Sequence, residues 1–139
     1  MNYKNLQQEI IVALRGRRSQ EQVNRKLGYN FNQVYRWESG KTQLSWKDFL
    51  RLAEVCNIEI AELFRDSFSY SENLQMTKNL SRHFVGKNTH AFVAKNLGIS
   101  RSLVSRWLIG AAKPNFSQML ALMDFGSAEF FRFIEALTK

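Results

Sequence analysis

The chain has few of the residues that build disulfides or metal sites. Cys56 is the single cysteine among 139 residues, and His83 and His90 are the only histidines. One cysteine cannot close a disulfide within the chain, and Cys56 stands in an apolar helical run where a buried thiol is expected. No cysteine lies near either histidine in the sequence, so we expect no metal site and no cofactor.

Long apolar runs, leader sequences and catalytic sets are also missing. No stretch of eighteen apolar residues and no signal-peptide pattern occurs, which favours a soluble, cytoplasmic protein without a membrane partner. No alternating pattern predicts a strand, so we expect an all-α fold. Paired carboxylates, a Ser/His/Asp or Cys/His set and a glycine-rich phosphate loop are not evident, and we expect no enzyme.

Positive charge is plentiful and clustered. The formal net charge is +8 and the pI about 9.9, a balance typical of proteins that bind nucleic acid, an anionic surface or an acidic partner. Residues 15–41 hold seven Lys/Arg against two acids, and residues 78–113 hold seven against none. The segments that follow each cluster are neutral to acidic.

The two basic clusters coincide with an internal repeat at an offset of seventy residues. Residues 19–40 return as residues 89–110 without a gap, and eleven of forty-nine positions between 16 and 64 are identical at this offset. Each copy reads as a helix, a turn on a glycine (Gly28 or Gly98) and a second helix, which is the spacing of a helix-turn-helix. The repeat supports a duplicated fold more strongly than a duplicated specificity.

The sequence predicts two helical bundles in tandem, each with about five helices and one helix-turn-helix. We place the domains at residues 1–66 and 67–139, around a linker at 65–71. Hydrophobic spacing and capping residues predict the helices. In the first unit they are 5–15, 20–27, 31–39, one that begins after Ser45, and 59–64; in the second they are 72–85, 89–96, 101–109, 116–125 and 128–137. The expected N-caps are Ser19, Asn30, Ser45, Thr89, Ser100 and Asn115, with Gln22 completing a capping box.

The motif residues resemble the Cro/C1 family, the XRE-type or lambda-repressor-like helix-turn-helix regulators, in two tandem copies. The matching residues are Ser19-Gln20-Glu21, Leu27-Gly28, Arg36-Trp37-Glu38-Ser39-Gly40, Val93-Ala94, Leu97-Gly98-Ile99-Ser100, Val104-Ser105-Arg106-Trp107, Gly110 and Lys113-Pro114. The resemblance implies that each unit places its third helix in the major groove of double-stranded DNA. It therefore implies a sequence-specific DNA-binding protein that regulates transcription.

Each copy departs from the family pattern in a different place. Asn24 stands where the family prefers alanine, so its amide must turn outward or find partners. The second copy keeps Ala94 but has His90-Ala91 in place of the Gln-Glu pair, and Leu108 replaces the acid of Trp-Glu. One unit could therefore bind DNA more weakly than the other.

By this resemblance, the start and middle of each third helix would contact bases, and residues around it would contact phosphates. The implied base contacts are Phe31, Asn32, Tyr35, Arg36, Arg101, Ser102, Ser105 and Arg106. The implied phosphate contacts are Arg17, Arg18, Gln20, Lys41, Lys87, His90 and Lys113. The alternatives are an ion pair within its own unit for Arg36 or Arg106, and plain solvation for the phosphate set.

Three questions stay open at the level of sequence. The Phe-rich last helix could pack on the other unit, or it could form a homodimer or partner-protein contact. The two units could be related by a twofold axis, which predicts an inverted DNA repeat, or by a tandem shift, which predicts a direct one. The rival functions are a protein-interaction module and a nonspecific nucleic-acid or RNA binder. A ligand sensor would lie in the cleft between the units, in a region beyond this sequence or in a partner.

Overall fold

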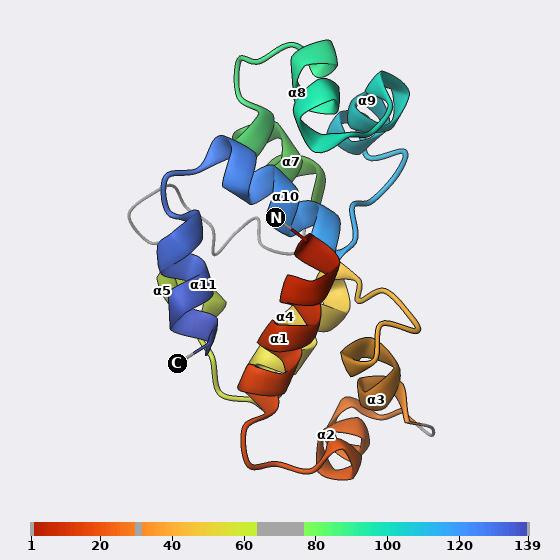
Figure 1. The fold of residues 1–139 in the computed structure, drawn as a ribbon, viewed down its shortest axis with the longest axis vertical. Helices are drawn as coiled ribbons and strands as arrows, with labels where there is room; N and C mark the ends of the chain where they lie inside the picture. Colours follow the sequence, from red (N-terminus) through yellow and green to blue (C-terminus); the bar gives the residue numbers. More distant parts are fainter. Residues whose placement is uncertain (1, 30–31, 64–76, 139) are drawn as a thin grey trace.

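The computed structural model describes residues 2–29, 32–63 and 77–138, which form α-helices joined by turns (Figure 1). The first unit contains α1 (Tyr3–Arg15), α2 (Gln20–Leu27), α3 (Gln33–Glu38), α4 (Trp46–Val55) and α5 (Ile60–Leu63). The second contains α7 (Thr77–Val85), α8 (His90–Leu97), α9 (Arg101–Ile109), α10 (Phe116–Gly126) and α11 (Phe130–Thr138). These described ranges hold no β-strand, and the expected all-α class is confirmed.

Capping side chains set most helix starts as the sequence predicts. Ser19 and Gln22 form a complete capping box at α2. The side chains of Ser45, Thr89, Ser100 and Asn115 each accept a hydrogen bond from the backbone N–H three residues on. The turns inside the two helix-turn-helix segments use Gly28 and Gly98 at φ 82° and 68°, a left-handed conformation that glycine adopts without a steric penalty.

The predicted start of the third helix is wrong by two residues. We expected a helix over 31–39, but α3 begins at Gln33, and Asn32 precedes it with ψ 55° and no capping hydrogen bond from its side chain. Asparagine favours such non-helical conformations because its amide competes for nearby backbone groups. The proposed cap Asn30, the linker at 65–71 and the residues 72–76 lie outside the described residues, as does the domain boundary, which stays a prediction.

Residues that are equivalent in the repeat meet at the centre of the molecule. Ser45 and Asn115, seventy positions apart, form an antiparallel bridge, and Phe116 N–H donates to the Leu44 carbonyl at 2.7 Å. The next equivalent pair, Trp46 and Phe116, stacks with ring centroids 6.1 Å apart. An antiparallel contact between a residue and its own equivalent is produced by a twofold axis, whereas a simple translation leaves equivalent segments parallel. The centre is therefore approximately twofold.

The twofold relation gives the molecule an elongated shape with one helix-turn-helix at each end. In Figure 1 the α2–α3 and α8–α9 pairs occupy opposite ends of the long axis, with α4 and α10 between them, and α3 and α9 both lie toward the right-hand side. The periphery is less symmetric, since α1 packs across on α10 and α11 while α7 packs on α10 of its own unit.

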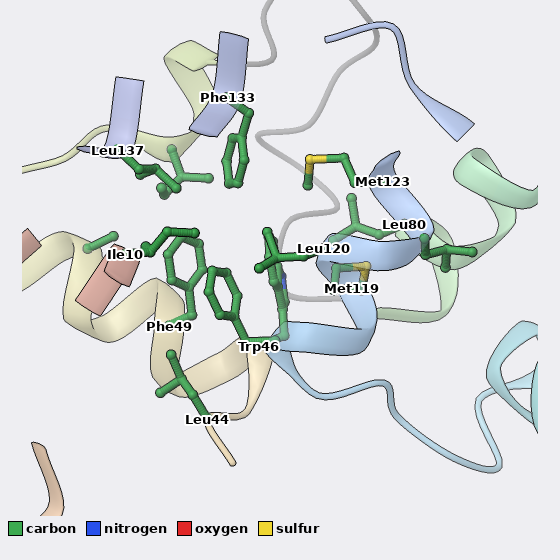
Figure 2. Packing of buried hydrophobic residues seen from close by; sticks show 14 of the residues in the cluster. Ile10, Leu44, Trp46, Phe49, Leu80, Met119, Leu120, Met123, Phe133 and Leu137 are labelled. Atoms are coloured by element: carbon green, nitrogen blue, oxygen red, sulfur yellow. The ribbon is translucent and has the colours of Figure 1, made fainter. Parts of the chain in front are cut away.

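A single hydrophobic core runs through both units. The Phe49 ring lies 4.1 Å from that of Phe116 and 6.3 Å from that of Phe133, measured between centroids. Figure 2 shows Phe49 and Phe133 among the buried side chains of this core. The centroid of the Phe130 ring lies 6.5 Å from that of the Tyr3 ring. The expectation that the Phe-rich last helix packs on the other unit is confirmed for Phe130 and Phe133, whereas Phe131 is 68% exposed. The homodimer alternative stays a prediction.

Two further side chains bear on stability. Cys56 is a free, buried thiol as predicted, and burial raises its pKa. The Tyr3 hydroxyl donates to Asp124 Oδ2 at 2.6 Å and so joins α1 to α10. Burial, and secondarily the Asp124 carboxylate, raise the pKa of Tyr3 to about 12.

The shared core predicts that a change at its centre destabilises both units together. Phe49→Ala removes a fully buried ring and should lower the free energy of unfolding by about 3–5 kcal/mol. Guanidinium unfolding followed by circular dichroism should still show one transition. The control Phe131→Ala removes the same side chain from an exposed position and should change stability by less than about 0.5 kcal/mol. Two separate transitions would contradict a common core.

The Tyr3–Asp124 hydrogen bond predicts a loss of stability at alkaline pH. Because folding raises the pKa of Tyr3 from 10.0 to about 12, its contribution is full below pH 10 and disappears as the pH rises toward 12. Tyr3→Phe should cost about 1–2 kcal/mol at neutral pH. The gap in unfolding free energy between wild type and this variant should narrow between pH 10 and 12. A gap that stays constant would contradict the assignment, and Tyr35→Phe serves as an exposed control.

Candidate nucleic-acid interface

The angle between α2 and α3 is held by buried side chains that the sequence predicts. Val23, Leu27, Val34 and Trp37 are at most 4% exposed. Their equivalents Val93, Val104 and Trp107 are at most 1% exposed, and Leu97 is half-buried. Both pairs of helices therefore keep a fixed outer face on α3 and α9.

The side-chain amide of Asn24, which departs from the family pattern, is buried and finds a hydrogen-bond partner in α3. It is 8% exposed, and its Oδ1 accepts a hydrogen bond from the backbone N–H of Val34 at 2.9 Å. This N–H belongs to the first turn of α3, where it has no partner within the helix. Asn24 thus ties the start of α3 to α2, a contact that Ala94 cannot make in the second unit.

A charged cluster joins α1, α2 and α3 in the first unit. Arg15 Nε and Nη2 donate to the two carboxylate oxygens of Glu38 at 2.8 and 3.0 Å. Gln20 Nε2 donates to the same carboxylate at 3.2 Å, and Arg15 Nη1 donates to the Arg18 carbonyl at 2.8 Å. A bidentate arginine–carboxylate pair has a defined geometry. The hydrogen bonds to Glu38 raise the pKa of Arg15.

In the second unit, apolar side chains form the equivalent junction. At the repeat offset, Val85 and Leu108 stand in the places of Arg15 and Glu38, and Val85 is fully buried. Arg82 Nε donates to the Leu108 carbonyl at 2.8 Å, which links α7 to the end of α9. Neither the Arg15–Glu38 pair nor its replacement is evident from the sequence of one unit, because the two residues lie 23 positions apart in the chain.

The outer face of α3 presents the predicted base-contacting residues of the first unit. Asn32, Tyr35 and Arg36 are exposed, and the Lys41 ammonium lies 5.3 Å from the centre of the Tyr35 ring. A cation over an aromatic face is a favourable contact that orients both side chains. Phe31, also predicted to contact bases, lies outside the described residues.

On α9 the predicted base contacts divide into free and engaged side chains. Arg101, Ser102 and Arg106 are exposed, whereas Ser105 is half-buried. The Ser105 hydroxyl donates to the Arg101 carbonyl at 3.2 Å and lies 2.8 Å from His90 Nδ1. Two predicted site residues, His90 and Ser105, are thus brought together at the junction of α8 and α9.

The alternative that Arg36 or Arg106 forms an ion pair within its own unit is wrong for the described part of the chain. No carboxylate among the described residues forms an ion pair with either arginine. In the first unit the nearby acid Glu38 is held by Arg15. Both guanidinium groups are therefore available to a partner outside the chain.

The predicted phosphate contacts are placed less uniformly. Arg17, Lys41, Lys87 and Lys113 are exposed, and Arg18 is half-buried. Gln20 and His90 occupy equivalent first positions of α2 and α8, and both are half-buried in hydrogen bonds to other side chains of their units. These two residues hold each helix pair together and stay partly exposed to solvent.

The described residues offer little for other chemistry. Among them no three His, Cys, Asp or Glu side chains gather where a metal ion would be held. Across residues 2–29, 32–63 and 77–138 no helix has the length and apolar character that crossing a bilayer requires.

The charged cluster predicts a specific pattern of mutant stabilities. Glu38→Ala leaves Arg15, whose side chain is 21% exposed, without its carboxylate and should cost about 1–3 kcal/mol. The double change Arg15→Val with Glu38→Leu copies the second unit and should cost less than the single change. Urea unfolding of the three proteins measures this. The control Glu21→Ala breaks the exposed Arg25–Glu21 pair and should cost less than about 1 kcal/mol. A double variant that is less stable than Glu38→Ala would contradict the account.

Comparison with known proteins agrees with this geometry in the first unit. Residues 12–64 match the model of a family described as a helix-turn-helix domain, a segment that begins in α1 and extends just beyond α5. Neither the curated proteins nor the solved structures gave a significant match to the chain. The first unit thus carries a helix-turn-helix domain, which points to DNA as a partner.

Proposed function

We propose that the protein binds specific sequences in double-stranded DNA and regulates transcription, with α3 and α9 as two recognition helices of the Cro/C1 type. The observation that carries the proposal is the repeated exposed arginine, Arg36 and Arg106, on the outer face of each third helix. Neither is held by an ion pair to a described residue. The proposal assigns no catalytic role to the chain.

The exposed residues supply suitable chemistry for reading bases. An arginine can donate two hydrogen bonds to guanine O6 and N7, and an asparagine such as Asn32 can bind adenine in the major groove. The Tyr35 ring offers an apolar face for a thymine methyl group. Each bidentate contact discriminates by about 1–3 kcal/mol against the wrong base.

The basic residues around the helix-turn-helix segments supply the contacts that set register. Arg17 precedes α2, Lys41 follows α3, and Lys87 and Lys113 flank α8 and α9 in the same way. Lysines and arginines at such places bind phosphates without reading sequence, and they release counterions when they do so. Binding should therefore weaken steeply as salt is added.

The twofold centre supports an inverted repeat over a direct one as the DNA site. Twofold-related recognition helices present the same face to both half-sites, whose centres would lie about 34 Å apart. The side chains of α3 and α9 differ, with Tyr35 in one and Ser105 in the other at the equivalent position. We therefore propose an imperfect palindrome whose two halves have different sequences, bound by one chain.

One observation favours the rival function, a protein-interaction module. Phe92 on α8 and Ile109 at the end of α9 are 52% and 68% exposed, and both belong to the second unit. An apolar contact through these side chains would resist salt, whereas DNA binding would not. Salt dependence combined with sequence preference thus separates the two functions.

Selection from a random duplex library tests the proposal. Wild type should enrich one two-part site, and Arg36→Ala and Arg106→Ala should each relax the preference for a different half while weakening binding by about 10- to 100-fold. The control Arg132→Ala removes the same charge from α11 and should leave the preference unchanged. If no sequence is enriched and both variants bind bulk DNA as wild type does, the helix-turn-helix is a scaffold for another partner.

A further inference from the structure

An open cavity separates the first unit from the helix-turn-helix of the second. It has a volume of about 460 Å³ and lies between the N-terminal end of α1, the turn that joins α8 to α9, and the first half of α10. Figure 1 shows the chain's N-terminus beside α10 at this place. A neighbouring cavity of about 550 Å³ shares Tyr3, Leu97 and Ala121 with it. Both volumes fall in the range of small-molecule sites.

The internal repeat shows how the two units differ at this place. The cavity is lined by Ile99, Gln118 and Ala121, whose equivalents in the first unit are Tyr29, Asp48 and Arg51. There the larger side chains contact one another, and a smaller cavity of about 380 Å³ is lined by Lys26, Leu27, Arg51, Glu54 and Val55. Tyr29 packs edge-on against Trp37 with ring centroids 5.7 Å apart and donates to Asp48 at 2.7 Å. Arg51 donates to the Leu27 carbonyl and lies 5.6 Å from the centre of the Tyr29 ring.

The cavity is lined by apolar side chains together with a few polar ones, among them Gln118 and Lys4. Trp107 lines it and is 1% exposed, and its indole N–H is buried without a hydrogen-bond partner among the described residues. The Gln118 Oε1 is already bound by the Asn115 backbone N–H, so its amide NH₂ is the group left for a ligand. Lys4 adds an exposed ammonium at the rim.

We propose that this cavity binds a small apolar molecule that carries a carboxylate, with the apolar body between Ile99 and Ala121 and the carboxylate toward the Gln118 amide NH₂ and Lys4. The Gln118 amide NH₂ matches an acceptor group, and the cation at the rim favours a negative one. In the first unit the larger Tyr29 and Arg51 stand in the places of Ile99 and Ala121.

The position of the cavity gives the ligand a regulatory role, which rests on the proposed DNA binding. Its walls come from α1 of one unit and from the α8–α9 turn of the other. A ligand that contacts both ties the α8–α9 turn more firmly to α1, and thereby changes the affinity for a site of fixed spacing. By reciprocity, DNA then shifts the affinity for the ligand by the same factor.

The direct test uses the indole N–H signals of Trp37, Trp46 and Trp107 in ¹H–¹⁵N spectra of the full chain, assigned with Trp→Phe variants. The probes are phenylacetate and octanoate, with phenylacetamide and 1-octanol as neutral counterparts, at concentrations extending above about 1 mM. At least one acid should shift the Trp107 signal saturably and bind more tightly than its neutral counterpart. This titration needs no DNA, so it stands even if the proposed function fails.

Variants locate the site. Ile99→Tyr with Ala121→Arg copies the larger side chains of the first unit and should abolish the Trp107 shift, while Ala128→Arg, an exposed control of equal charge change, should preserve it. Lys4→Glu, at an exposed position, should weaken the acid by roughly fivefold, the effect of one exposed charge pair, without weakening the neutral probe. Absence of any Trp107 shift, or an unchanged shift in the double variant, would overturn the site. An acid that binds but leaves affinity for the selected duplex unchanged would overturn its regulatory role.

Discussion

The contact between Trp46 and Phe116 at the centre of the molecule is the constraint on which the remaining structure depends. These rings are equivalent in the repeat, and the backbone beside them is joined by the hydrogen bond from Phe116 N–H to the Leu44 carbonyl. A bundle of about seventy residues alone buries only a modest core. Sharing Phe49, Phe116 and Phe133 lets both halves bury their aromatic residues in one core. The same packing fixes the orientation of α3 relative to α9, so stability and the geometry of the two outer faces have one origin.

Within this frame the two helix-turn-helix segments are held by different local chemistry. The first uses polar contacts, namely the Arg15–Glu38 pair and the Asn24 hydrogen bond to Val34. The second uses apolar side chains at the same positions, Val85, Leu108 and Ala94. The first unit packs Tyr29 against its tryptophan and Arg51 over Tyr29, whereas the second has the smaller Ile99 and Ala121 beside a larger cavity. The halves therefore share an architecture while differing in what they present to DNA and to small molecules.

Much of the fold follows from the sequence because its signals are local. Caps such as Ser19, Thr89 and Asn115, and the left-handed Gly28 and Gly98, act over three or four residues. The start of α3 differs from the predicted one because Asn32 is compatible with either side of a helix boundary. The candidate base contacts follow from motif position, and the structure leaves Arg36 and Arg106 exposed. The Arg15–Glu38 pair, the Ser45–Asn115 bridge and the cavity beside Trp107 could not be predicted, because each joins residues far apart in the chain through packing alone.

The most direct test of the central claim, that one rigid core holds two recognition helices in a twofold arrangement, is hydroxyl-radical footprinting on a selected duplex. The account predicts that a single chain protects two stretches of backbone about one helical turn apart, on one face of the DNA and arranged about a dyad. Inserting half a turn between the two halves should abolish simultaneous protection, because the core does not bend to follow. A single protected stretch, or two stretches that stay protected after the insertion, would contradict a fixed pair of readers.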